Sequence, residues 1–209
     1  MLKLENITLT YDGQSTCVKC NLALGVGEIC AVIGPSGVGK SSLLLAIAGF
    51  KERRSGTMTW QGHSFAENAI WDRPLSLLFQ SDNLFGHLTA LRNIQLGAPK
   101  SSKKSENSAK IAQIAQKLDI ADILHKPCSE ISGGQQQRVG LARSLISQKP
   151  ILLLDEPFSA LDKINRHKAL DVVREITQSH QLATIIVTHD EDDIALLGAQ
   201  SLRLQREPL

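Results

Sequence analysis

A glycine-rich stretch near the amino terminus carries the residue types that bind phosphate groups. Residues 34–42 read GPSGVGKSS and satisfy the pattern G-x-x-x-x-G-K-[ST] at every required position. Glycines at this spacing let backbone N–H groups converge on phosphate oxygens, while Lys40 is suited to reach the terminal phosphates and the Ser41 hydroxyl to ligate Mg²⁺. The alternative is a glycine-rich turn that binds nothing. The expected phosphate-binding residues are Gly34, Pro35, Ser36, Gly37, Val38, Gly39, Lys40, Ser41 and Ser42.

Two adjacent carboxylates follow a run of four apolar residues. The run Ile151–Leu154 is typical of a central parallel strand, and Asp155 and Glu156 stand at its end. Asp155 is placed to hold Mg²⁺ through water, and Glu156 to orient or polarise an attacking water. Two acids that merely begin a turn are the alternative.

Gln80 and His189 also follow apolar stretches. Leu75–Phe79 and Ala183–Val187 predict buried strands that end directly before or one residue before them. In open α/β sheets, ligands gather at the carboxyl ends of the strands. We therefore expect Gln80 to belong to the site and His189 to sense a terminal phosphate, the alternative for a single histidine being a purely structural role.

A second pair of glycines begins another predicted helix. Ser132, Gly133, Gly134 and Gln135 precede a segment, residues 139–146, whose apolar residues follow helical spacing. Ser132 is suited to cap this helix, and the free N–H groups beside the glycines make its start an anion-binding position. By itself, this motif is weak evidence.

The elements that must position these residues alternate between strands and helices. Ile29–Ile33 predicts the strand before the phosphate loop, and Ser42–Gly49 predicts the helix after it. Leu2–Thr10 and Thr16–Leu24 predict an antiparallel hairpin laid beside that strand. Tyr11, at the hairpin turn, is suited to stack on a nucleotide base, although an aromatic residue that only packs is the alternative.

The middle and the end of the chain have a different character. Residues 81–127 carry apolar residues at helical spacing, interrupted by the polar tract Lys100–Ser105, which predicts a helical insertion with its own small core. Leu170–Gln178 predicts another helix, and the tail 200–209 offers at most one short strand.

The composition is that of an ordinary globular chain. Of 209 residues, 42% are hydrophobic and 21% charged. The formal net charge of +2 is too small to argue for a nucleic-acid partner, and we expect none. No apolar run approaches the roughly 20 residues that cross a bilayer, so we expect a cytoplasmic protein. The four cysteines are too few for a disulfide framework. Cys17 and Cys20 lie three apart in a predicted strand and should point to opposite faces, which argues against a metal or redox pair.

Together these motifs resemble the nucleotide-binding subunit of the ATP-binding-cassette (ABC) transporters. The resemblance covers nearly the whole chain and rests on five motifs in the family's order: the phosphate loop, the Q-loop at Gln80, the signature at Ser132–Gln135, the Asp155–Glu156 strand end and the switch histidine His189. Ser159–Asp162 is similar to the D-loop of the family, and Tyr11 matches its base-stacking A-loop aromatic. One departure is Ile131 in place of the usual leucine, a change of similar volume.

The resemblance implies a fold and its division. It implies an α/β fold with a P-loop NTPase core, in which a mostly parallel sheet is flanked by helices, together with an N-terminal antiparallel β subdomain and a helical signature subdomain. Residues 1–209 then form one domain. Within it, 1–80 and 150–209 hold the RecA-like core and the antiparallel subdomain, and 81–149 form the helical subdomain.

The resemblance also implies the chemistry. ATP and Mg²⁺ would bind between two copies of the chain paired head to tail, with Ser132, Gly133, Gly134 and Gln135 acting on the other copy's nucleotide and Asp162 also belonging to the nucleotide site. Gln80 and Asp155, with Ser41, would hold or sense Mg²⁺, Glu156 would be the catalytic carboxylate, and His189 would contact the γ-phosphate.

The partners implied are integral membrane permease subunits and a solute-binding protein, with the chain on the cytoplasmic face of a bacterial inner membrane. The stretches Arg73–Gln80 and Asn83–Thr89 are similar to importers of thiamine and related small solutes. The alternatives are an exporter-type ATPase and a non-transport ABC protein that acts as a nucleotide-driven clamp.

Overall fold

A computed structural model describes residues 1–10, 16–81, 83–99 and 103–208, with only the backbone of Thr16 described. The strands are β1 Leu2–Thr10, β2 Thr16–Leu24, β3 Ile29–Ile33, β4 Ser55–Trp60, β5 His63–Ser64, β6 Leu75–Leu78, β7 Ile151–Asp155, β8 Ala183–Val187, β9 Gln200–Arg203 and β10 Arg206–Pro208. The α-helices are α1 Lys40–Ala48, α2 Ala90–Gly97, α3 Lys104–Lys117, α4 Gly133–Leu145, α5 Lys163–Ser179 and α6 Glu191–Leu197. Short 3₁₀ helices cover Ile70–Asp72, Ala121–Ile123 and Cys128–Glu130.

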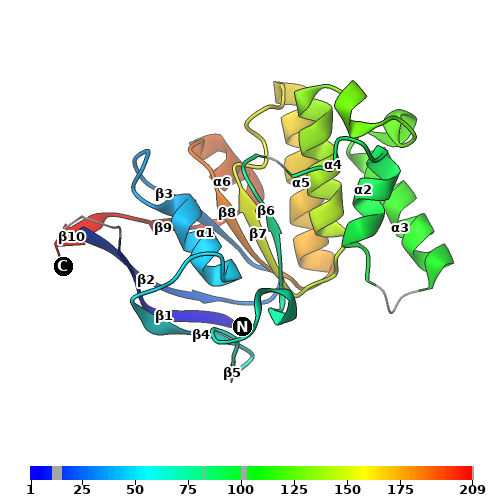
Figure 1. Cartoon of the computed structure of the whole chain (residues 1–209). Coiled ribbons are helices and arrows are strands. Elements are labelled where there is room, and N and C mark those ends of the chain that lie inside the picture. The colour runs from blue at the N-terminus through cyan, green and yellow to red at the C-terminus, as the bar shows by residue number, and fades with distance from the viewer. Residues whose placement is uncertain (11–15, 82, 100–102, 209) are drawn as a thin grey trace.

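A parallel sheet with the strand order β6-β7-β8-β3-β9 forms the centre of the molecule (Figure 1). Its inner strands are short apolar runs, whereas the edge strand β9 is mostly polar and exposed. Strands β7 and β8 are buried along their whole length, as expected for parallel strands covered on both faces. Because parallel strands share one carboxyl edge, the segments that follow β3, β6, β7 and β8 leave the sheet on the same side. These are the segments that carry the polar residues of interest.

A second, antiparallel sheet has the order β10-β2-β1-β4-β5. The β1–β2 hairpin is antiparallel as predicted, with Leu2 opposite Leu24. It does not pair with β3, however, whose hydrogen-bonded neighbours are β8 and β9. The expectation of at most one strand in the tail was wrong, because β9 extends the parallel sheet and β10 pairs with β2.

Two hydrophobic clusters cover the two faces of the parallel sheet. Along β3, Ile29 and Ala31 belong to one cluster, while Cys30 and Val32 belong to the other. The first cluster includes residues of all the helices from α2 to α6, and the second includes α1 and the antiparallel strands. This alternation follows from the two-residue period of a strand, and it lets β3 contribute side chains to both hydrophobic clusters.

The helical insertion predicted over 81–127 is present as α2, α3 and the 3₁₀ helix Ala121–Ile123, but its described residues do not form a small core of their own. Ile94, Ile111 and Ile114 lie in the same cluster as Leu152 of the parallel sheet. Two helices of this size expose too much apolar surface to form a core alone, so they share that of α4 and the sheet. The division of the chain at residues 80 and 150 stays a prediction.

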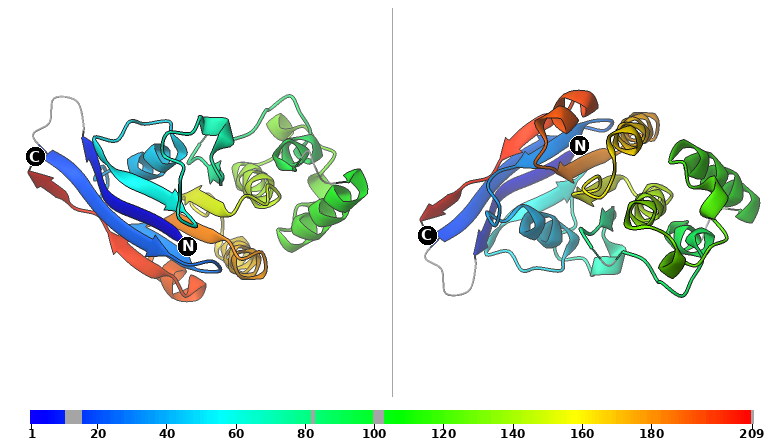
Figure 2. Two further views of the ribbon diagram at one scale, coloured as in Figure 1. Left: turned by 90° about the horizontal axis from the view of Figure 1, so that it is seen from below. Right: turned by 90° about the horizontal axis from the view of Figure 1, so that it is seen from above.

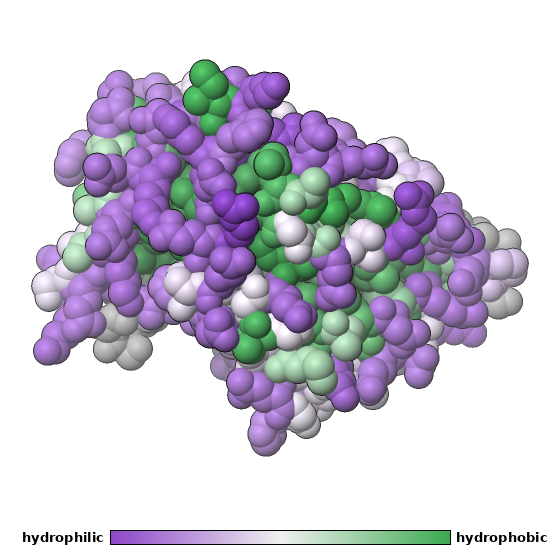
Figure 3. Space-filling model, turned by 180° about the vertical axis from the view of Figure 1, so that it is seen from behind, coloured by the Kyte–Doolittle hydropathy of each residue, from purple (hydrophilic) through white to green (hydrophobic). Residues whose placement is uncertain are grey.

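Figures 1 and 2 show the helical part and β10 at opposite ends of the molecule, with the parallel strands between them. Seen from behind, the surface is mostly polar, and its apolar residues gather near the middle (Figure 3). A notch at the lower left of this view lies between the helical part and a projection at the bottom of the molecule. Of the helices in the described ranges, none combines the length and the apolar composition that a bilayer-spanning helix needs.

Candidate nucleotide site

The phosphate loop runs from the end of β3 to the start of α1. Gly34 has φ +148°, and a Cβ there would lie 2.8 Å from the Leu204 carbonyl oxygen, so both its conformation and its surroundings demand glycine. The Lys40 ammonium donates to the carbonyl oxygens of Gly34 at 2.9 Å and Pro35 at 3.1 Å, which places the cation across the loop. The helix that follows begins with N–H groups and a positive dipole end, and the loop therefore offers an anion site.

Ser41 joins this loop to the end of β7. Its hydroxyl donates to Asp155 Oδ1 at 3.1 Å, although the two residues are 114 positions apart. Burial raises the pKa of Asp155, and the nearby Glu156 raises it further, whereas the Ser41 hydrogen bond and the Lys40 cation lower it. A hydroxyl and a carboxylate are hard oxygen ligands of the kind that Mg²⁺ prefers, so this pair fits the ion that the sequence predicts.

Glu156 and His189 meet one strand further along the same edge. His189 Nδ1 lies 3.5 Å from Glu156 Oε2, and both residues line a small cavity of about 50 Å³. Glu156 has φ +46°, a left-handed conformation, and its N–H donates to the Val187 carbonyl at 3.1 Å. The β7–β8 pairing thus brings together the carboxylate and the imidazole that the sequence placed at two separate strand ends.

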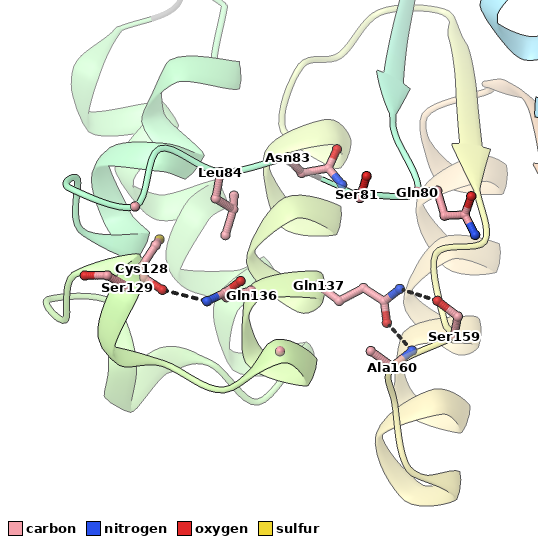
Figure 4. A pocket seen from close by; sticks show the side chains of 12 residues that line it. Gln80, Ser81, Asn83, Leu84, Cys128, Ser129, Gln136, Gln137, Ser159 and Ala160 are labelled. Carbon is pink, nitrogen blue, oxygen red and sulfur yellow. Dashed lines mark hydrogen bonds between the residues drawn. The ribbon is translucent and has the colours of Figure 1, made fainter.

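Gln80 lies after β6, exposed, at the mouth of a larger cavity of about 270 Å³. This cavity is also lined by residues of α4, such as Gln136, and by Ser159 of the segment after β7. Figure 4 shows the Gln80 side chain beside the end of β7, across the cavity from Cys128 and Ser129. The structure therefore places Gln80 between the strand edge and the helical part.

The signature residues begin α4. Ser132 is the N-cap: its hydroxyl accepts from the Gln135 N–H at 3.3 Å, and Gln135 Oε1 accepts from the Ser132 N–H at 2.9 Å. This capping box leaves the Gly133 and Gly134 amides at the start of the helix. Gln135 was predicted to bind nucleotide, and its side chain here contacts its own helix.

Asp162 likewise caps a helix. It is the N-cap of α5 and accepts from the N–H groups of Ile164 and Asn165, both at 3.0 Å. The hydrogen bond from the Asn165 backbone is the main cause that holds the pKa of Asp162 below its ordinary value. Its expected place at the nucleotide remains a prediction.

The phosphate loop and the signature lie in different parts of the molecule. Leu43 of α1 and Leu141 of α4 belong to different hydrophobic clusters, and Figures 1 and 2 show the two helices apart. One chain therefore offers two separate anion-binding helix starts. Ser42 follows the loop and its hydroxyl accepts from Lys51 Nζ at 3.5 Å, while Tyr11 lies outside the described residues.

Sequence reasoning missed the residues that support the site. Arg166 of α5 contacts Asp190 at 2.6 Å and Asp193 at 2.8 Å, and Thr188 donates to Asp193 at 2.7 Å. This network holds Thr188 and Asp190, the two residues adjacent to His189 in the chain. A buried Asp193 could not be distinguished in sequence from its exposed acidic neighbours, because the three acids of residues 191–193 differ only in the direction that α6 gives them.

Comparisons with known proteins show the family of the chain. The family model for ABC transporters matches residues 18–159. The chain is 41% identical over 203 residues to the thiamine import ATP-binding protein ThiQ of Photorhabdus laumondii, covering 97% of this chain and 86% of that protein. It is 43% identical over 203 residues to ThiQ of Yersinia pseudotuberculosis, covering 97% and 85%.

Solved structures give the same result. The dimeric structure of a bacterial ABC transporter cassette superposes with a TM-score of 0.84 at 26% identity, covering 100% of this chain and 99% of that one. A dimeric post-hydrolysis cassette bound to ADP and Pi superposes with a TM-score of 0.83 at 25% identity and the same coverage. The predicted α/β class is thereby confirmed, and the chain belongs to the ABC transporter family as one of its ATP-binding, ATP-hydrolysing subunits.

Proposed function

We propose that this chain powers the import of thiamine, or of a closely related small solute, through a separate membrane permease. The observation that carries the proposal is the 41–43% identity to named thiamine import ATP-binding proteins over 97% of the chain. The similarity spans all five motifs that the sequence analysis singled out, since the aligned part leaves only a few residues uncovered.

In this proposal, the phosphate loop binds the nucleotide. Backbone amides of residues 34–42 would hold the β- and γ-phosphates, and Lys40 would exchange its bonds to the Gly34 and Pro35 carbonyls for bonds to phosphate. Tyr11 would stack on the base. Such an exchange keeps the ammonium hydrogen-bonded at each stage, so binding costs little desolvation of the cation.

Glu156 would act on the attacking water, with His189 and Gln80 beside it. The 3.5 Å contact between Glu156 and His189 lets the imidazole orient the carboxylate and lie near the γ-phosphate. Ser41, Asp155 and Gln80 would hold Mg²⁺, which supplies charge neutralisation at the phosphates. The 3.1 Å Ser41–Asp155 hydrogen bond supports this assignment, because it fixes two oxygen ligands side by side.

A second copy of the chain would complete each site. Ser132, Gly133 and Gly134 begin a helix whose free amides suit a γ-phosphate, and the separation of α4 from α1 favours their acting on the partner's nucleotide. Gln135 and Asp162 would support that interface. Dimeric relatives among the solved structures are consistent with this arrangement.

The permease would contact the surface beside Gln80. Phe50 is 53% exposed, Phe79 is 37% exposed, and their rings meet edge to face with centroids 5.4 Å apart. Phe85, five residues after Gln80 in the chain, is also exposed. Exposed aromatic residues beside a polar cavity are typical of a protein interface. The chain would then lie on the cytoplasmic face of the inner membrane, and a solute-binding protein would deliver the solute from the other side.

Two experiments test the proposal, one for the solute and one for the catalytic carboxylate. In cells that lack their own thiamine import ATPase but retain its permease, the wild-type chain should restore uptake of radiolabelled thiamine. Glu156→Gln should bind ATP, accumulate as an ATP-bound dimer, and hydrolyse ATP at least about 100-fold more slowly, because the carboxylate that activates water is lost.

Lys40→Ala provides the contrast in this experiment. It should lose tight ATP binding and form no ATP-dependent dimer, although Glu156 is intact. Wild-type hydrolysis by Glu156→Gln would overturn the assignment of the carboxylate. If the wild-type chain hydrolyses ATP normally but does not restore thiamine uptake, the assignment of the solute is wrong and the assignment as an ATPase stands.

A further inference from the structure

Gln137 of α4 reaches out of the helical part and contacts the segment that follows β7. Its Nε2 donates to the Glu156 carbonyl oxygen at 3.0 Å and to Ser159 Oγ at 3.1 Å. Its Oε1 accepts from the Ala160 N–H at 2.9 Å. Figure 4 shows this side chain extended from α4 between the two parts of the molecule, with its amide against Ser159 and Ala160. One side chain thus uses both ends of its amide on a single short segment.

The backbone that Gln137 contacts is in a conformation that needs support. Glu156 has φ +46°, which is unfavourable for a residue with a Cβ. Its N–H is held by the Val187 carbonyl at 3.1 Å, and its carbonyl accepts from Gln137 and from Ser159 Oγ at 3.1 Å. These bonds hold both peptide groups of Glu156, and so they set the direction in which its side chain leaves the backbone.

The other end of Gln137 belongs to the helix that carries the signature. Gln137 lies little more than one turn from Ser132, the N-cap of α4. The helix start packs closely on the same segment, since a Cβ on Gly134 would lie 3.0 Å from the Ala160 carbonyl oxygen. A shift of the α4 start is therefore transmitted directly to residues 156–160.

We infer that Gln137 is a positioning residue that holds the Glu156 carboxylate in its working direction and couples it to the position of the signature helix. The inference rests on the proposed roles of Glu156 and of the α4 start. It adds a connection within one chain: the helix that grips the partner's nucleotide also sets the carboxylate that acts on the chain's own nucleotide.

The neighbouring Gln136 offers a matched control. It has the same side chain on the same helix, but its Nε2 donates to the carbonyl oxygens of Cys128 at 2.9 Å and Ile131 at 3.2 Å. Both acceptors precede α4 in the helical part. Loss of the Gln136 amide removes hydrogen bonds of the same kind without touching the segment of Glu156.

The test compares Gln137→Ala with Gln136→Ala in the full-length chain. Gln137→Ala should lower kcat at least about tenfold while changing the equilibrium affinity for ATP less than about twofold, because a displaced group costs catalysis more than binding. An ATP-bound dimer should accumulate, as with Glu156→Gln. Gln136→Ala should keep kcat within about twofold of the wild type.

Gln137→Glu separates positioning from folding. It keeps the side-chain length and the acceptor for the Ala160 N–H, but it replaces the donor to the Glu156 carbonyl by an oxygen. The same loss of kcat is expected, with the thermal unfolding midpoint measured beside it, so this variant carries the test if Gln137→Ala does not fold.

The outcomes separate this inference from the proposed function. Normal ATP hydrolysis by Glu156→Gln would contradict both the proposed role of Glu156 and the inferred role of Gln137. An inactive Glu156→Gln combined with wild-type kcat in Gln137→Glu overturns the inference alone. Equal losses of kcat in Gln136→Ala and Gln137→Ala also overturn it, because the effect would then come from the helical part in general.

Discussion

The Asp193 carboxylate needs hydrogen-bond partners within the protein, because its side chain is only 1% exposed to solvent. It accepts hydrogen bonds from Arg166 and Thr188, and the hydrogen bond to Asp193 is the main cause that raises the pKa of Arg166. A buried charge left without its partner costs several kcal/mol, whereas an exposed ion pair is worth little. At the scale of single residues, burial of one partner therefore decides how much an ion pair contributes.

Arg166→Leu should lower the free energy of unfolding by about 3 kcal/mol, because Asp193 stays buried with one partner fewer. The control is Arg174→Leu on the same helix, whose ion pair with Asp171 is exposed on both sides and whose loss should cost about 1 kcal/mol or less. Urea unfolding of both variants measures the difference. Equal losses would show that the buried Asp193 carboxylate does not depend on Arg166.

The limits of sequence analysis are clearest in the three consecutive glutamines. Gln135 caps its own helix, Gln136 binds carbonyls before α4, and Gln137 contacts residues 156–160. The three side chains are chemically identical and differ only in the direction that the helix gives them. By contrast, Asp155 and His189 could be placed from sequence, because an apolar run followed by a polar residue indicates the end of a buried strand.

At the scale of elements, the backbones of α2 and α4 approach each other very closely at the end of α2. A Cβ on Gly97, the last residue of α2, would lie 2.2 Å from the Arg143 carbonyl oxygen of α4. Gly86 has far more room, since the nearest atom to its Cβ would be Ser129 Cβ at 3.9 Å. Close approach of helices through glycine explains how short α2 is held against α4.

Gly97→Ala should destabilise the protein by about 1–3 kcal/mol through overpacking, and Gly86→Ala should be close to neutral. Thermal unfolding followed by circular dichroism compares the two variants. A neutral Gly97→Ala would mean that α2 moves away from α4 at little cost.

Strands were easier to predict than the short helices and the chain end. β3 and β8 have the predicted bounds, because continuous apolar runs flanked by polar residues are unambiguous. Helix α6 was missed because it is short and begins with three acids. Strands β9 and β10 were missed in part, because they pair with strands more than 160 residues away in the chain.

At the scale of the whole molecule, all four cysteines lie in the interior. Burial raises the pKa of Cys20 to about 11 and that of Cys30 to about 12, from an ordinary 9.0. For Cys30, the neighbouring Cys20 adds to the rise and a hydrogen bond from the Leu202 backbone opposes it. The expectation that Cys17 and Cys20 lie on opposite faces did not predict that both are buried, because β2 is covered on both sides at Cys17.

The buried thiols predict a loss of stability at alkaline pH. Because the folded pKa is above the unfolded one, the folded state keeps protons that the unfolded chain releases, so this stability is complete below pH 9 and is lost as the pH rises toward 12. Cys30→Ala should reduce the fall in unfolding free energy by up to about 1.4 kcal/mol per pH unit in that window. Val32→Ala, on the same strand, should leave the slope unchanged, and equal slopes in both variants would refute the prediction.

The division into a parallel sheet and an antiparallel one was expected from the resemblance to the ABC family and is confirmed, but the residues of the strands alone did not predict it. The β1–β2 hairpin and β3 are adjacent in the chain, and nothing in their residues indicates that they belong to different sheets. What decides it is the two-sided burial of β3, which needs parallel neighbours and helices, whereas β1 and β2 tolerate an exposed face. Both parallel neighbours of β3, the strands β8 and β9, lie in the C-terminal half of the chain.

The position of β3 in the sheet also affects how the chain is made. Its neighbours are residues 184–187 and 200–203, so the strand that leads into the phosphate loop leaves the ribosome with its pairing partners still unmade. Pairing across such a separation in sequence is slow, and an unpaired apolar strand is prone to associate with other chains. The phosphate loop is thus among the first parts of the nucleotide site to be synthesised, and the strand that leads into it is among the last to find its partners.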